Sequence, residues 1–430
     1  MKIDNIICST ALILLLSGCE KKSDRITNRE DYNHFLLSEV DKVKEFSLSE
    51  IVFWQGKFDA APNQISYLSK IAANYGVLFE ETGDINYLYK AEDLLLESNE
   101  TLKYSEVGTI RALARNYITQ HRFKEALKLT EKAFKIGEGM QETQKLFFDV
   151  HMELGNYEEA KNCLKFICNE NDFDCLIRMA KWNDHQGDLQ TAISLMEKAV
   201  EKAKINGHDG LLLWAYSNLG DMYGHAGRIQ NAYDSYLKAL KINPNHSFAL
   251  KGLAWIAFSH EKNTKEALRI VNHISKKHNS PDFYLLKAEI AEYEKDEALK
   301  ESSMKGYFKM LEQNNYGVMY NKYNALLYAD DKDSAQKALV IAQEEVNNRP
   351  TPDSYDLLAW AYFNLGDTKK AFEIVQKYVA DKSFEPELNY HVATIYKANN
   401  LKNKIKPIKE DLKASIFELG PNMTDKIEDL

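Results

Sequence analysis

Residues 214–244, with the sequence WAYSNLGDMYGHAGRIQNAYDSYLKALKINP, decide the fold. The first half places apolar residues at helical spacing around Leu219, and the small Gly220 follows directly. Gly227 can end this helix, because glycine adopts the positive φ of a C-terminal cap without strain. A second helical stripe follows with Ala232 on its inner side, and a proline closes the segment. The pattern predicts two helices that are joined by a tight turn and packed against each other.

The same pattern recurs along most of the chain. A residue equivalent to Leu219 occurs ten times, at successive spacings of 38, 34, 32, 40, 34, 34, 36, 35 and 34 residues. These anchor positions are Tyr75, Leu113, Phe147, Met179, Leu219, Leu253, Lys287, Tyr323, Leu358 and Val392. In five units an alanine follows the anchor after 13 residues, an offset that unrelated helices would hardly reproduce. The sequence therefore predicts an array of stacked helical repeats.

Residues 214–244 resemble the tetratricopeptide repeat (TPR), a helix-turn-helix unit of about 34 residues. The resemblance implies an all-α fold, an α-solenoid of about nine or ten units over residues 63–403 that forms a right-handed superhelix. Because each unit of such an array contacts only its neighbours, we expect an extended superhelix without a single globular core. We also expect N-terminal capping helices over 35–62, a C-terminal capping helix over 404–419 and a frayed tail over 420–430.

The first residues have the pattern of an export signal. Residues 6–16 form an apolar run that is too short to span a bilayer but fits the core of a secretion signal. The tetrapeptide LSGC at residues 16–19 resembles the lipobox of bacterial lipoproteins, which implies cleavage before Cys19 and lipidation of that cysteine. On this interpretation residues 1–18 are a lipoprotein signal peptide and residues 19–34 a polar tether, and a plain signal peptide is the alternative.

The lipobox implies a lipid-anchored protein of the bacterial envelope. By the same resemblance, Glu20 is not the aspartate that often marks retention at the inner membrane, so the outer membrane is favoured. The sequence leaves open whether the protein faces the periplasm or the exterior. In an oxidising compartment Cys168 and Cys175 could form a disulfide between two successive helices, and buried free thiols are the alternative.

Composition and motifs bear on the class of function. The chain has 55 basic and 64 acidic residues, a net charge of −9 with both signs interleaved, which disfavours nucleic acid as a partner. It contains no glycine-rich phosphate loop, HExxH, GxSxG or CxxC motif. The repeats leave no room for a separate catalytic domain, so we expect a protein that is not an enzyme and that needs neither a cofactor nor a metal.

The candidate binding surface is the concave groove of the superhelix. In TPR proteins, offsets −2, +2, +5 and +6 from each anchor lie on this side. In the C-terminal half these offsets give aromatic residues that an extended peptide or an amphipathic helix could dock against, Trp255, Phe258, Tyr328, Trp360 and Phe363. In the middle they give charged residues and histidines, Lys181, Asp184, His185, Asp221 and His225. The alternative for the rings is ordinary core packing, and for the histidines a surface role.

Two classes of function fit these observations. The lipobox and the TPR array together favour a scaffold or adaptor that binds a protein or peptide partner in its concave groove. The competing class is a surface lipoprotein of the SusD-like type, which binds nutrients or glycans and places aromatic rings against sugars. Such proteins carry large insertions outside their repeats, and this chain lacks them. An enzyme that acts through the Asp and His residues of the groove is a third hypothesis.

Overall fold

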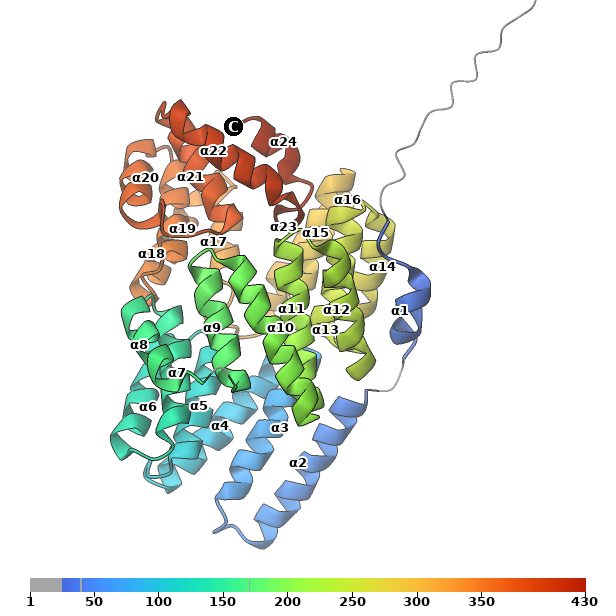
Figure 1. The fold of residues 1–430 in the computed structure, drawn as a ribbon, viewed down its shortest axis with the longest axis vertical. Coiled ribbons are helices and arrows are strands. Elements are labelled where there is room, and N and C mark those ends of the chain that lie inside the picture. The colour runs from blue at the N-terminus through green and yellow to red at the C-terminus, as the bar shows by residue number, and fades with distance from the viewer. Residues whose placement is uncertain (1–24, 39–40, 170) are drawn as a thin grey trace, which may run out of the picture.

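The computed structural model describes residues 25–38, 41–169 and 171–430, and within these ranges it consists of helices without a strand (Figure 1). Ten helix pairs follow one another along this part of the chain. In chain order they are α3 (Ser66–Thr82) and α4 (Ile85–Thr101), α5 (Val107–Thr119) and α6 (Phe123–Ile136), α7 (Met140–Glu153) and α8 (Tyr157–Ile167), α9 (Phe173–His185) and α10 (Leu189–Asn206), α11 (Asp209–His225) and α12 (Ile229–Ile242), α13 (Ser247–Trp255) and α14 (Thr264–Ile274), α15 (Asp282–Glu294) and α16 (Glu297–Gln313), α17 (Asn321–Ala329) and α18 (Ala335–Asn348), α19 (Pro352–Asn364) and α20 (Thr368–Ile374), and α21 (Pro386–Ala398) and α22 (Lys402–Ala414). The predicted all-α solenoid of nine or ten units is confirmed.

Small residues make the close packing of each pair possible. All ten anchors lie on the first helix of a pair, and the predicted partner alanines, among them Ala232, are buried. The ring of Tyr236 on α12 fits between α11 and α13, where a Cβ at Gly220 or Gly252 would lie only 2.7 Å or 2.4 Å from it. Gly227 ends the turn between α11 and α12 with a φ of +69°, which glycine adopts without strain. The local sequence therefore determines how the two helices of each pair pack.

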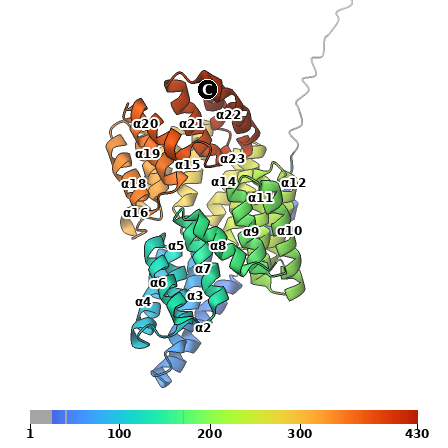
Figure 2. The ribbon, with the colours of Figure 1, turned by 60° about the vertical axis from the view of Figure 1, so that its left-hand side comes forward.

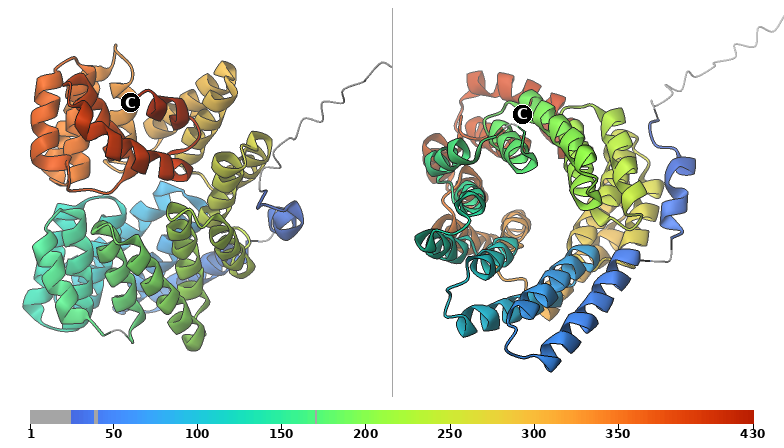
Figure 3. Two further views of the ribbon diagram at one scale, coloured as in Figure 1. Left: turned by 45° about the horizontal axis from the view of Figure 1, so that its top comes forward. Right: turned by 60° about the horizontal axis from the view of Figure 1, so that its bottom comes forward.

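The superhelix makes more than one full turn, and its second turn packs directly on the first. Figure 2 shows α18 above α6, and Figure 3 shows the pairs arranged around a common axis. The contacts between the turns include hydrogen bonds from Tyr89 Oη to Asn315 O (2.8 Å) and from Lys124 Nζ to Asn347 O (2.5 Å), and an ion pair between Arg349 and Glu153 (3.6 Å). These partners lie up to 226 residues apart in the sequence. The expectation of an extended superhelix, in which each pair contacts only its neighbours, is therefore wrong, because the turns rise too little to stay apart.

The N-terminal segment is a docked arm and does not behave as the polar tether expected over 19–34. From Arg25 onwards it is described by the structure, and it forms α1 (Arg29–Leu36) on the outer side of α12 and α14 (Figure 1). Tyr32 and Phe35 are buried there, so the segment has an apolar side that the polar composition concealed. The predicted signal peptide and Cys19 lie outside the described residues.

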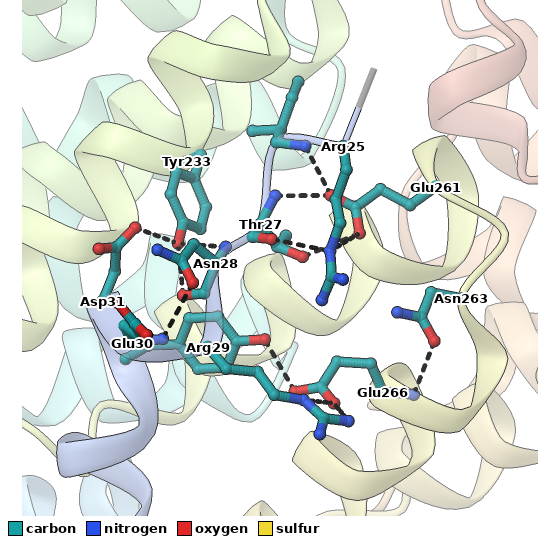
Figure 4. Close-up of polar contacts among 12 residues, drawn as sticks. Arg25, Thr27, Asn28, Arg29, Glu30, Asp31, Tyr233, Glu261, Asn263 and Glu266 are labelled. Carbon is teal, nitrogen blue, oxygen red and sulfur yellow. Dashed lines mark hydrogen bonds and ion pairs between the residues drawn. The ribbon is translucent and has the colours of Figure 1, made fainter. Parts of the chain in front are cut away.

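Two glutamates of the repeat array hold this arm. Glu261 Oε1 accepts hydrogen bonds from the backbone N–H groups of Ile26 (2.8 Å) and Thr27 (2.6 Å). Glu266, fully buried, accepts a hydrogen bond of 2.7 Å from the hydroxyl of Tyr32 and pairs with Arg29 (Figure 4). It also pairs with Arg269 of its own helix, at 2.6 Å. A buried carboxylate with this many donors is well satisfied, so the arm is fixed in place.

The two ends of the array also differ from the expectation. Of the capping region predicted over 35–62, only α2 (Lys42–Ala60) packs on the first pair, against α3. At the other end α23 (Ile416–Leu419) and α24 (Met423–Glu428) follow α22. The predicted frayed tail over 420–430 is wrong, because the apolar Ile427 is buried and α24 packs against α22.

Candidate binding cavity

A cavity of about 750 Å³ lies on the concave side of the C-terminal half. Its wall consists of side chains from α13, α15, α17, α19 and α21, the first helices of five successive pairs. Residues of α23 and α24, among them Leu419 and Met423, line the same space, so the C-terminal segment forms part of the wall. The volume falls in the range of about 300–1,000 Å³ that is usual for ligand pockets. The first helices therefore line a partly enclosed cavity here.

Two tryptophans that the sequence placed on the groove both line this cavity. Trp255 on α13 is partly buried, and its indole Nε1–H donates a hydrogen bond of 2.9 Å to the backbone carbonyl of Phe417. Trp360 on α19 is stacked on the imidazole of His391, with ring centroids 4.0 Å apart. Both indoles are fixed by these contacts, so they offer rigid aromatic surface to a ligand.

Acidic side chains in the cavity outnumber the bases that could neutralise them. Lys322 pairs with Glu387 at 2.9 Å, and the other close contact is from Lys251 to Asp282 at 3.8 Å. Four further lining carboxylates make no ion pair with any described residue, namely Glu289, Asp330, Glu385 and Glu418. Lys426 is the one lining lysine without an ion pair among the described residues. The cavity therefore contains more carboxyl groups than cationic side chains.

The pKa values reflect this excess. The pKa of Glu289 is raised to about 8, chiefly by burial; the nearby Glu292 and Glu387 also raise it, whereas Lys251 and Lys426 lower it. Desolvation raises the pKa of Glu385 to about 7, with Glu418 and other carboxyls adding to the effect. A carboxyl that keeps its proton near neutral pH lacks a cationic neighbour able to hold it ionised.

A buried histidine faces the same space. His391 on α21 is 5% exposed, lines the cavity and contacts Asp356 through Nδ1 at 2.7 Å. Burial lowers the pKa of His391, but the Asp356 carboxylate outweighs it, so the pKa is raised overall. Its Nε2 makes no hydrogen bond within the described part of the chain. This ring therefore has a free polar edge towards the cavity.

The charged residues predicted in the middle of the groove lie next to this cavity. Asp184 and His185 line a pocket of about 60 Å³ that also contains Glu385, so the two spaces share a side chain. His225 contacts Asp221 at 3.8 Å, and the surrounding carboxylates raise its pKa although burial opposes this. Lys181 lies apart from them in an ion pair with Glu153, at 2.8 Å. No group of three potential metal ligands occurs in the part of the chain that the structure describes.

Comparison with known proteins identifies the repeats. Residues 174–245 and residues 352–380 match family models of the tetratricopeptide repeat. The chain contains tetratricopeptide repeats. No curated protein matches its sequence. Outside these two segments most of the helix pairs carry the same pattern of an anchor followed by small residues; the pair anchored at Lys287 and the last pair, which has Ile405 at the alanine position, depart from it.

Several solved structures share the helical repeat architecture with this TPR protein. Human IFIT1, a dimer with PPP-AAAA, is 12% identical over 73% of this chain and 71% of its own, with a TM-score of 0.48. PilF of Pseudomonas aeruginosa is 14% identical over 51% of this chain and 96% of its own, with a TM-score of 0.37. YrrB, a TPR protein with an unusual peptide-binding site, is 22% identical over 46% of this chain and 95% of its own, with a TM-score of 0.27. Because all three TM-scores are below 0.5, nothing about ligands is carried over from them.

Three aromatic residues predicted on the groove of this TPR protein do not line the cavity. Phe258 was expected there and is fully buried instead, in the π-helical turn η1 (Ile256–His260) that extends α13. Its ring packs between those of Trp255 and Tyr293, with centroids 5.7 Å and 5.8 Å away, so it belongs to the core. The other two rings also lie outside the lining, where Tyr328 stacks on Phe308 and Phe363 stacks on the lining residue Trp360.

Sequence reasoning missed the acidic side chains of the cavity, although a signal for one of them was present. Glu289 follows the anchor Lys287 by two residues, the same offset that places Trp255 and Trp360. His391 directly precedes the anchor Val392 and could not be found from the four offsets used. The C-terminal residues of the wall had been assigned to a cap and a tail, where no groove pattern applies.

The remaining predicted site is the cysteine pair. Cys168 Sγ and Cys175 Sγ lie 2.8 Å apart, and both residues are free thiols in the structure. Burial and the neighbouring Cys168 raise the pKa of the Cys175 thiol to about 12, so this thiol stays protonated at neutral pH. The two side chains already adjoin across the turn between α8 and α9.

No helix among the described residues has both the length and the apolar character needed to cross a membrane.

Proposed function

We propose that this TPR protein is a non-catalytic scaffold or adaptor that binds a segment of a partner protein in the cavity of its C-terminal half. The observation that carries the proposal is the position of Trp255 and Trp360, which are three repeats apart and line one cavity of about 750 Å³. Rigid aromatic side chains in a concave, desolvated space are the usual anchors of peptide recognition.

A role without catalysis is supported by the chemistry of the cavity wall. The described lining residues include no Ser, Thr or Cys that could act as a nucleophile beside His391. His391 is itself occupied by Asp356 and by the ring of Trp360. The wall consists of aromatic, aliphatic and charged side chains, which suit binding.

We further propose that the protein is a lipoprotein of the bacterial envelope, anchored through Cys19 and located at the outer membrane. The LSGC tetrapeptide at residues 16–19 supports this, together with Glu20 at the position after the modified cysteine. Metabolic labelling with palmitate tests the anchor. We expect label in the wild-type protein and none in Cys19→Ser, and an unlabelled wild-type protein would contradict the anchor.

Site-specific photo-crosslinking in intact cells tests the binding site. Tyr323 lines the cavity and is 41% exposed, whereas Phe134 on α6 is 42% exposed and lies outside the cavity. A photoreactive phenylalanine at position 323 should give protein adducts that are absent with the same group at position 134. Trp255→Ala should abolish the adducts at position 323 while the circular dichroism melt stays cooperative. The same adducts from both positions, or adducts unaffected by Trp255→Ala, would refute the site. Binding of glycans in place of protein would support the SusD-like alternative.

A further inference from the structure

The cavity contains more carboxyl groups than its cationic side chains can pair with. Glu289 and Glu418 are half-buried lining residues that form no ion pair within the described residues. They come from elements far apart in the sequence, α15 and α23, so the folded chain brings them to one space. Like charges in a partly desolvated site repel each other and destabilise the compact state. A purely structural cavity would gain stability from neutral side chains at these positions.

An aromatic ring lies directly beside one of these carboxyl groups. Gly420 shows this, because a Cβ built on it would lie 2.6 Å from Glu289 Oε1 and 3.1 Å from Cη2 of Trp255. The carboxyl group and the indole therefore face the same point of the wall. A carboxylate next to an indole favours a positively charged group, which gains an ion pair and a cation–π contact together.

The free edge of His391 supplies a second, independent requirement. This side chain is about nineteen-twentieths buried, lines the cavity and leaves Nε2 without a partner in the described residues. Because Asp356 holds Nδ1, Nε2 is the ring nitrogen left for a ligand, and the raised pKa of His391 favours the imidazolium form, in which Nε2 donates a hydrogen bond. A backbone carbonyl of a peptide can accept that hydrogen bond, whereas a simple polyamine has no acceptor to offer. The ligand must therefore combine a cation with a carbonyl group.

We infer that the cavity binds a peptide segment that carries a lysine or arginine side chain, with the cation at Glu289 and the Trp255 indole, Glu418 adding a further carboxyl group to the same cavity, and a backbone carbonyl at His391. This inference rests on the proposed function, because it names the chemistry of the segment bound at the same site. The unpaired carboxylates are then retained for binding, at a cost in the stability of the free protein.

Fluorescence anisotropy with defined probes tests the inference on the full chain in detergent. The probes are a labelled Gly-Leu-Lys-Gly-Leu-Lys peptide, the same peptide with glutamate in place of lysine, and spermine as a competitor. We expect the lysine peptide to bind, the glutamate peptide not to bind, and spermine to compete only weakly. Glu289→Gln and Glu418→Gln should each weaken binding of the lysine peptide about tenfold.

A matched control separates a binding role from a structural one. Glu312 on α16 is exposed and lies outside the cavity lining, so Glu312→Gln makes the same charge change without touching the site. Glu289→Gln and Glu418→Gln should melt at the same or a higher temperature than the wild type, because each replaces a desolvated carboxyl group that has no ion-pair partner with a neutral amide. Glu312→Gln should leave the affinity unchanged. A lower melting temperature with unchanged affinity would mean that the carboxylates are structural and would overturn the inference.

Other outcomes distinguish this inference from the proposed function. Equal binding of the lysine and glutamate peptides would overturn the inference, and so would spermine that competes as strongly as unlabelled lysine peptide. Crosslinks from position 323 to a partner segment without lysine or arginine would overturn it as well, while the scaffold role would stand. Absence of both crosslinks and peptide binding would overturn the two together.

Discussion

Removal of the Glu266 charge should release the N-terminal arm. Burial alone would raise the pKa of this carboxyl, but hydrogen bonds from Arg269, Tyr32 and Arg29 outweigh burial and lower it from 4.5 to about 2. Each pKa unit corresponds to about 1.4 kcal/mol, so the ionised group contributes about 3 kcal/mol to the free energy of unfolding at neutral pH. We expect Glu266→Gln to lower the free energy of unfolding by about that amount.

The pH dependence of this loss has a defined sign. Because the pKa of Glu266 is lower in the folded than in the unfolded chain, its contribution is complete well above pH 4.5 and declines as the pH falls from 4.5 to 2. At pH 3 the difference between wild type and Glu266→Gln should therefore shrink to about 1.5 kcal/mol. Urea unfolding followed by circular dichroism at pH 7 and pH 3 measures both values.

Limited proteolysis reports the arm itself, and Glu30→Gln is the matched control. Glu30 is exposed on α1, so its substitution removes a charge from the arm without touching the buried network. Trypsin should cleave Glu266→Gln at Arg29 faster than it cleaves the wild type or Glu30→Gln. A loss of unfolding free energy below about 0.5 kcal/mol in Glu266→Gln, or a loss that is the same at pH 3 as at pH 7, would refute the stabilising role of the Glu266 network.

Two further predictions concern packing and the thiols. Gly252→Ala should lower the melting temperature by several degrees, because its Cβ would lie 2.4 Å from the Tyr236 ring. Gly76→Ala, whose Cβ would have no atom within 4 Å, should stabilise the folded protein by up to about 1 kcal/mol. Equal melting temperatures of the two variants would contradict the packing. A mild oxidant should join Cys168 to Cys175, whose sulfur atoms are 2.8 Å apart, with the loss of two hydrogens in mass spectrometry, and Cys168→Ser should show no such loss. A mass that oxidation leaves unchanged in the wild type would contradict this proximity.

The helix pairs could be predicted from the sequence because their determinants are local. An anchor such as Leu219, the glycine after it and Ala232 lie within one repeat, and each pair buries the same positions. The stripe of apolar residues at helical spacing sets the inner side of each helix. The same local offsets placed Trp255 and Trp360 on the wall of one cavity.

The features that the sequence did not reveal depend on the accumulated geometry of many repeats. Small rotations and rises add up along the array, and only their sum brings Lys124 to Asn347. The docked arm depends likewise on Glu266, which lies 234 residues after its partner Tyr32. Phe258 was misplaced because η1 changes the helical period after Trp255, so an offset counted at 3.6 residues per turn no longer applies.

The contact between the two turns has a consequence for how such a protein can change in evolution. In an open array a repeat can be duplicated or deleted, because each unit meets only its neighbours. Here Tyr89 meets Asn315 and Glu153 meets Arg349 only because a fixed number of units lies between them. Insertion of a single helix pair between Glu153 and Asn315 would advance the second turn by one unit and mismatch these contacts together. The contact between the two turns therefore constrains the number of repeats, so that substitutions are the main route to a new specificity.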